Sequence, residues 1–382
     1  MYRLTEPQER LLDELLRIAS EHIAPHAGEV DEKARFPREA LTALAGSGWL
    51  GLTIPEEYGG KGQGLRLACA ALDEIAQNCA STAMVYLMHL CGSACLAAHP
   101  QGHEETLRRI ASGQCLTTLA WSETGSRSHF WAPVSQAFQD NGHVVLNARK
   151  SWVTSAGEAD VYIVSTRLSA GTETPEVMLY SVARQDSGVS VSGDWSALGL
   201  RGNESAPMNL ENCRIPRERA LCEDGKGFPR MMEILPWFNL GNCAISVGLA
   251  EAATRTTVAH LSAARLEHLD SRLADFPTLR ARAATMRIET DRARAHLASA
   301  LDALESGSPQ TMLLVLESKT SGAQTAAHVT DLGMQACGGA AFSGHLSLER
   351  NFRDARAAAV MAPTSDVLLD FIGRALCGMD LF

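Results

Sequence analysis

The chain has 382 residues and a formal net charge of −10, from 34 Lys and Arg against 44 Asp and Glu. With 46% hydrophobic and 20% charged residues it can form a large core, which excludes a mainly disordered protein. No segment concentrates basic residues and no apolar run approaches the roughly 18 residues of a membrane span, so we expect neither nucleic acid nor a membrane as a partner.

In the first part of the chain the apolar residues recur with the period of an α-helix. Thr5 to Gln8 has the pattern of a capping box, and apolar residues then follow on one helical face as far as Ile23. Further helices are expected over 37–45 and 65–98. The start is charged and has no signal-peptide core, and the ten cysteines form no CxxC pair. This usage is typical of reduced thiols in a cytoplasmic protein without a metal site.

The spacing of the apolar residues then changes twice along the chain. Between 116 and 226 the apolar runs are strand-sized and separated by Gly, Asn, Asp and Ser, which predicts a compact antiparallel barrel or sandwich. After Gly227 the helical period returns in long runs, which indicates an antiparallel bundle. We therefore predict an α+β protein with an N-terminal helical domain at 1–115, a middle β domain at 116–226 and a C-terminal helical bundle at 227–382. The strand runs are 143–146, 161–164, 177–180 and 208–210, and the helical runs are 228–265, 277–305, 310–337 and 364–376.

Four segments in this order, 37–60, 120–128, 150–160 and 334–354, resemble the acyl-CoA dehydrogenase family. The resemblance covers nearly the whole chain. It implies a middle antiparallel β-barrel, a C-terminal four-helix bundle, FAD as cofactor, a CoA thioester as the small-molecule substrate, and a homodimer or homotetramer.

The resemblance also implies site residues. The flavin loop of the family falls on 121–129, its W-x-T motif on 152–154, and its Q-x-x-G-G motif, which binds the ADP half of FAD across a subunit boundary, on 335–339. Ser128 is in addition the expected contact for the pantetheine arm of the substrate. The implied FAD-binding residues are Trp121, Ser122, Ser128, Trp152, Val153, Thr154, Gln335, Gly338, Gly339 and Thr364.

The catalytic base departs from the family pattern. Removing the α-proton of a thioester requires a well-placed base, and the family uses a glutamate in a Y-E-G-T motif. That motif falls on 361–364 and puts Ala362 at the glutamate position, whereas the alternative position on an earlier helix is Phe238. The catalytic residue is therefore unknown. Candidate replacements are Asp366, Glu233 and His129, although residues of this kind are more commonly solvated or structural.

A second departure concerns the family's R-x-x-F-G segment, which is degraded at 266–270, although Arg265 lies one residue away. Three hypotheses follow. The favoured one is an FAD-dependent oxidoreductase that has abandoned ordinary desaturation and works like an oxygenase (a monooxygenase), with its flavin reacting with O2. The alternatives are a conventional acyl-CoA dehydrogenase with a relocated base and a non-catalytic paralogue that binds flavin or acyl-CoA.

Overall fold

The computed structural model describes residues 2–127, 129–168 and 176–381. Its N-terminal part is helical, as predicted, and the side chain of Gln8 accepts a hydrogen bond of 3.1 Å from the Thr5 N–H at the start of α1. The expected helix over 65–98 is two helices, because the chain turns between 77 and 79. The helices of this part are α1 (Glu6–Ile18), α2 (Ala27–Glu32), α3 (Arg38–Gly46), α4 (Leu65–Ala76), α5 (Ala80–Ala97) and α6 (Glu104–Ala111).

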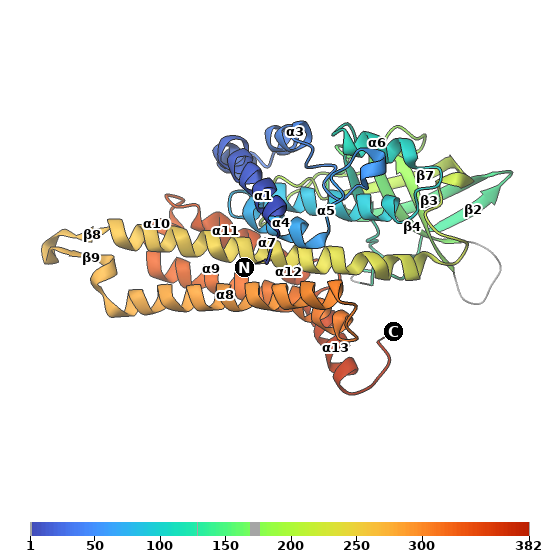
Figure 1. The fold of residues 1–382 in the computed structure, drawn as a ribbon. Coiled ribbons are helices and arrows are strands. Elements are labelled where there is room, and N and C mark those ends of the chain that lie inside the picture. Colours follow the sequence, from blue (N-terminus) through green and yellow to red (C-terminus); the bar gives the residue numbers. More distant parts are fainter. Residues whose placement is uncertain (1, 128, 169–175, 382) are drawn as a thin grey trace.

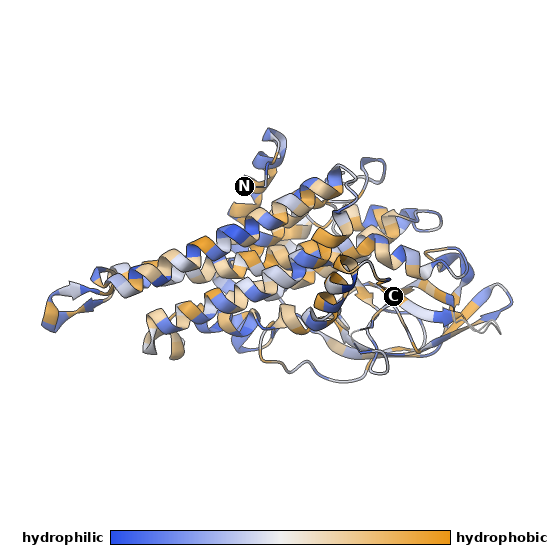
Figure 2. Ribbon diagram, turned by 90° about the horizontal axis from the view of Figure 1, so that it is seen from below, coloured by the Kyte–Doolittle hydropathy of each residue, from blue (hydrophilic) through white to orange (hydrophobic). Residues whose placement is uncertain are grey.

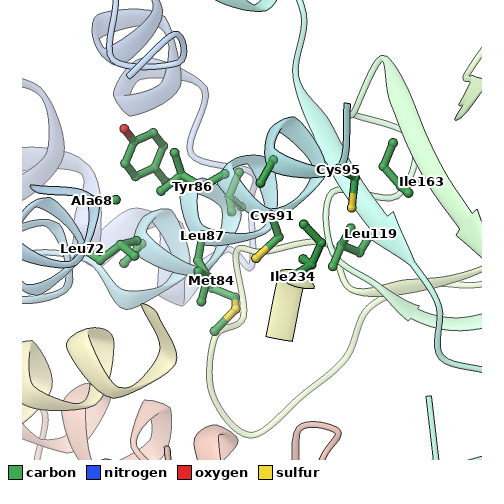
Figure 3. Close-up of a cluster of buried hydrophobic side chains, with 14 of the residues drawn as sticks. Ala68, Leu72, Met84, Tyr86, Leu87, Cys91, Cys95, Leu119, Ile163 and Ile234 are labelled. Carbon is green, nitrogen blue, oxygen red and sulfur yellow. The ribbon is translucent and has the colours of Figure 1, made fainter. Parts of the chain in front are cut away.

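Helix α5 is the central element of the hydrophobic core. It has 18 residues and a mean hydropathy of 1.4, so the prediction that no apolar run approaches a membrane span was wrong for this segment. Within the fold 89% of it is buried, which is the environment of a core helix. Figure 3 shows Met84, Leu87 and Cys91 of this helix pointing into a cluster that also contains Leu119 and Ile234. The core thus runs from the helices into the sheet.

The middle part forms one seven-stranded sheet, with the order β1-β4-β2-β3-β7-β6 and β5 paired to β4. Most pairs are antiparallel as predicted, but β1 and β2 both pair with β4 in parallel. Because β5 pairs along the whole of β4, β1 and β2 share the other edge of β4, one after the other. The strands are β1 (Thr117–Ala120), β2 (Gln136–Asp140), β3 (His143–Val153), β4 (Val161–Leu168), β5 (Glu176–Ala183), β6 (Val189–Val191) and β7 (Ala206–Pro216).

The C-terminal part is a bundle of long helices that pack against α4, α5 and the sheet (Figure 1). A hairpin of β8 (Arg265–Leu266) and β9 (Ser271–Arg272) projects from the end of the bundle that lies away from the sheet (Figures 1 and 2). The long helices agree with the predicted runs to within a few residues. The helices are α7 (Gly227–Ala263), α8 (Pro277–Glu305), α9 (Thr311–Cys337), α10 (Gly339–Phe342), α11 (Leu348–Asp354), α12 (Ala357–Val360) and α13 (Ser365–Leu376).

Polar contacts join the three parts at the end of α11. The Arg353 guanidinium donates to the carboxylate of Asp31 at 2.9 Å and to the carbonyl of Leu198 at 3.1 Å. The buried Asp354 carboxylate accepts a 2.6 Å hydrogen bond from the N–H of Leu200. Burial raises the pKa of Asp354 to about 6. These contacts hold α2 of the N-terminal part, the segment 198–200 of the middle part and α11 of the C-terminal part around a common space.

Candidate active site

A cavity of about 950 Å³ occupies that space. Its walls come from α5, from the loop after β1, from the end of β3, from the segment 195–205, from α7 and from the segment 353–364. Met84, Leu119 and Ile234, which belong to the core cluster of Figure 3, form part of the wall, so the cavity is set directly into the core. A space of this size can hold a large planar cofactor together with an apolar substrate group.

The cavity brings together several of the residues implied by the sequence resemblance. Five of the ten predicted cofactor residues line it, together with both expected base positions. The lining residues in question are Trp121, Ser122, Trp152, Thr154, Thr364, Phe238 and Ala362.

The remaining predicted residues lie elsewhere. Val153 is 1% exposed, belongs to the hydrophobic core and does not line the cavity. Gln335, Gly338 and Gly339 lie at the C-terminal end of α9 and do not line it either. A Cβ atom built on Gly338 or Gly339 meets nothing within 4 Å, so this end of α9 is open. Ser128 lies outside the described residues.

The loop that carries Trp121 and Ser122 leaves the sheet after β1 and returns at β2. A buried ion pair ties this loop to β3: the Lys150 ammonium lies 2.6 Å from the Glu123 carboxylate, and the two side chains are 0% and 1% exposed. The same carboxylate accepts hydrogen bonds from the N–H groups of Val134 (2.6 Å) and Ser135 (3.0 Å). Burial raises the pKa of Glu123, but Lys150 and these donors outweigh burial and leave the pKa below its usual value. Glu123 is therefore an ionised structural group.

Aromatic side chains fix the rest of this loop. The ring of Phe130 stacks on that of Trp121, with centroids 5.8 Å apart and planes 17° apart. Trp131 contacts both Phe130 (5.2 Å) and Phe371 of α13 (5.4 Å). The loop is thus anchored on the bundle as well as on the sheet, and Phe130 contributes to the cavity wall.

Trp152 is exposed at the mouth of the cavity. Its side chain is 67% exposed, and its backbone has a φ of 57°, which a tryptophan rarely adopts. The ring touches Trp195 edge-on at 5.9 Å, and Trp195 also lines the cavity. The exposed aromatic face of Trp152, fixed by a backbone conformation with positive φ, is well placed to pack against a planar ring.

Two buried polar atoms in the cavity wall have no partner within the described chain, namely Trp121 Nε1 and Asn203 Oδ1. Buried polar groups are nearly always hydrogen-bonded, so a donor and an acceptor left free here fit a polar ligand. The Thr154 hydroxyl is instead paired with that of Ser205 at 3.0 Å. The wall therefore suits an isoalloxazine ring. Sequence reasoning missed Asn203 and Trp195, and no motif of the chain points to them.

The cavity contains no free carboxylate among its described lining residues. Glu123 is the only acidic side chain there, and it is tied to Lys150. The three candidate replacement bases lie outside the cavity wall. Asp366 is exposed in the first turn of α13, Glu233 is paired with Arg230 on α7, and His129 is exposed and in edge contact with Trp131 at 5.0 Å.

Comparisons with known proteins agree with this architecture. Models of the N-terminal, middle and C-terminal domains of acyl-CoA dehydrogenases match residues 5–114, 118–213 and 225–377. A probable acyl-CoA dehydrogenase, FadE25 of Mycobacterium tuberculosis, is 29% identical over 98% of this chain and 97% of its own length.

Solved structures share the fold. Butyryl-CoA dehydrogenase from Megasphaera elsdenii superposes with a TM-score of 0.92 at 22% identity, covering 98% of this chain and 99% of its own. The prolyl acyl carrier protein oxidase AnaB superposes with a TM-score of 0.88 at 19% identity, covering 98% and 99%. Together with the three domain matches, the fold shows that the chain belongs to the acyl-CoA dehydrogenase family, whose members are FAD-dependent oxidoreductases.

Proposed function

We propose that this enzyme binds FAD and an acyl-CoA in the cavity described above, and that its reaction is oxygenase-like rather than an ordinary α,β-desaturation. The observation that carries the proposal is the missing base. Ala362 and Phe238 occupy the two positions where the family resemblance places a carboxylate, and the only acidic side chain in the described cavity wall, Glu123, is bound to Lys150.

The residues of the chain support a flavin at the Trp152 side of the cavity. When bound, FAD supplies a hydride acceptor and, once reduced, a group that can pass electrons to O2. Trp152 offers its exposed face for stacking, Trp121 Nε1 a free donor and Asn203 Oδ1 a free acceptor. Ser122 completes this wall, and Thr364 lines the cavity near the C-terminal segment.

The cavity also has an apolar lining that suits an acyl group. Its wall includes Met84, Met88, Ile234, Leu235 and Phe238. Nothing in this wall can take a proton from an unactivated Cα, whose acidity is far below that of a carboxylic acid. The substrate that fits is therefore an acyl group with an already acidic proton or a conjugated ring. Within the loop, Ser128 is our proposed contact for the CoA arm.

A conventional desaturation is the alternative, and the similarity to a probable acyl-CoA dehydrogenase over almost the whole chain favours it. It requires a base from outside the cavity wall, for which Asp366 on α13 is the candidate. Replacing Asp366 by Asn should then abolish flavin reduction by a saturated acyl-CoA. An unchanged rate of flavin bleaching in that variant would remove this alternative.

The deciding experiment is the visible spectrum of the purified, flavin-loaded protein. A panel of saturated acyl-CoAs is added without oxygen, and air is admitted afterwards. Our proposal expects no bleaching by saturated acyl-CoAs, followed by rapid reoxidation in air once the flavin has been reduced chemically. Bleaching by a saturated acyl-CoA that persists in air until an electron acceptor is added identifies a dehydrogenase and contradicts the proposal.

We also propose that the enzyme is at least a dimer. The segment 335–339 that should bind the ADP half of FAD is open at the end of α9, and Phe342 beside it is 85% exposed. A second copy covering this end supplies both a partner for the exposed apolar ring and a reason for the glycines. Light scattering should give a mass of at least twice 41.0 kDa, and Phe342→Asp should lower both that mass and the FAD content.

A further inference from the structure

Lys319 is a buried lysine in the N-terminal half of α9. Its residue is 0% exposed, and its ammonium donates hydrogen bonds to the carbonyl oxygens of Ala358 (2.8 Å), Met361 (3.0 Å) and Pro363 (2.9 Å). An ammonium group has three hydrogens, so all of them are used. No ion pair of Lys319 with an acidic side chain is present among the described residues, so only backbone carbonyls and the ring of Phe238 face its ammonium. Burial without a charged partner lowers the pKa of Lys319 to about 7.

The three carbonyls belong to one segment of the cavity wall. They lie on either side of Ala362, and 360–364 line the cavity. The ring of Phe238, which lines the cavity from α7, has its centroid 5.9 Å from the same ammonium. Lys319 therefore lies behind both positions at which the family resemblance expects the base.

This segment has few other means of holding its shape. Helix α12 ends at Val360, Met361 has an extended backbone, and α13 starts only at Ser365. The last carbonyls of a helix have no partner within it, and Pro363 has no N–H to donate. Without Lys319, three carbonyls next to the core would lose their donor, which favours local opening.

We propose that Lys319 is a positioning residue that holds 358–363 in the conformation needed at the reacting end of the cavity. The role rests on the proposed use of this cavity for an acyl group. Lys319 does not itself line the cavity, and it acts on a ligand only through the backbone that it binds.

The test compares Lys319→Met, which removes the donors, with the wild-type protein by hydrogen–deuterium exchange. The control is Leu301→Ala on α8, which creates a cavity in the core at a fully buried position away from this wall. Amides of 361–368 should exchange at least tenfold faster in the Met variant and no more than twofold faster in the control. Equal exchange in a folded Met variant and the control overturns the proposal.

A second readout is ligand binding without turnover. Octanoyl-CoA is titrated into each flavin-loaded variant and followed by the change in the flavin spectrum. The dissociation constant should rise at least fivefold in the Met variant relative to the control. If the exchange result holds while octanoyl-CoA fails to bind even the wild-type protein, the cavity does not accept a simple saturated acyl-CoA, whereas the role of Lys319 in the segment stands.

Should the Met variant not fold, Lys319→Gln is measured in the same way. Its amide is shorter and donates only two hydrogens, so it cannot replace all three bonds. Faster exchange of 361–368 in this variant supports the proposal. A wild-type exchange rate there overturns it.

Discussion

Replacing Lys150 by Met should destabilise the protein through the carboxylate left behind. Glu123 and Lys150 form a 2.6 Å ion pair with both side chains essentially unexposed, and removing one partner of such a pair typically costs about 3–5 kcal/mol. The Glu123 carboxylate keeps its hydrogen bonds from the Val134 and Ser135 N–H groups. We therefore expect the lower end, about 3 kcal/mol of unfolding free energy.

The double variant Lys150→Met/Glu123→Gln separates charge from packing. A glutamine can still accept hydrogen bonds from the loop, and it leaves no unpaired charge in the core, so the double variant should lose less than Lys150→Met alone. Urea unfolding followed by circular dichroism measures both losses. The FAD content should fall in step, because this pair ties the loop carrying Trp121 and Ser122 to β3.

A surface ion pair in the same sheet provides the control. Arg214 lies 3.1 Å from Asp140, but the two side chains are 47% and 46% exposed, and such pairs contribute only about 0–1 kcal/mol. Arg214→Met should therefore cost at most about 1 kcal/mol. If Lys150→Met costs no more than Arg214→Met, or if the double variant loses at least as much as Lys150→Met alone, the reasoning about a desolvated pair is wrong.

Three further predictions concern pH, cofactor and base. Burial lowers the pKa of His89 to about 4, against roughly 6.5 in the unfolded chain. Between pH 7 and pH 5 this histidine therefore gains a proton only in the unfolded chain, and the free energy of unfolding should fall by about 2 kcal/mol. The variant His89→Gln should lack this pH-dependent loss, and parallel curves of stability against pH for the variant and the wild-type protein would contradict the prediction. Trp152→Ala should raise the flavin dissociation constant about tenfold with little loss of stability, because the ring is 67% exposed, and full flavin content would count against the assignment. Ala362→Glu with Pro363→Gly should increase desaturation of a simple acyl-CoA by about a hundredfold or more, and no gain would mean that the cavity as well as the base has changed.

Much of the fold could be predicted because its long elements have a clear period. The runs that became β3, β4, β5 and β7 and the long bundle helices were recognisable. Strand β1 was missed because it is short and buried on both faces, so it shows no alternation. The break between α4 and α5 was missed because no glycine or proline marks it.

The site was less accessible to sequence reasoning. Trp121, Ser122, Trp152, Thr154 and Thr364 were named only through the family resemblance. Residues that tertiary contacts bring to the cavity carry no local signal. In the sequence, Lys319 cannot be told from an ordinary surface lysine of a helix. It is buried only because the segment 358–363 folds back over it and accepts its hydrogen bonds. Asn203 lies in an irregular segment without a recognisable motif.

The shared edge of β4 has a consequence for redesign of this enzyme. The chain leaves that edge after β1 and rejoins it at β2, and the Glu123 carboxylate joins the two ends of the loop by accepting hydrogen bonds from the N–H groups of Val134 and Ser135. Changes between Glu123 and Val134 therefore leave the register of every strand unaltered, provided that Phe130 and Trp131 keep their contacts with Trp121 and Phe371. Loops grafted from other members of the family into this frame should alter which acyl groups enter while the sheet and the bundle keep their structure.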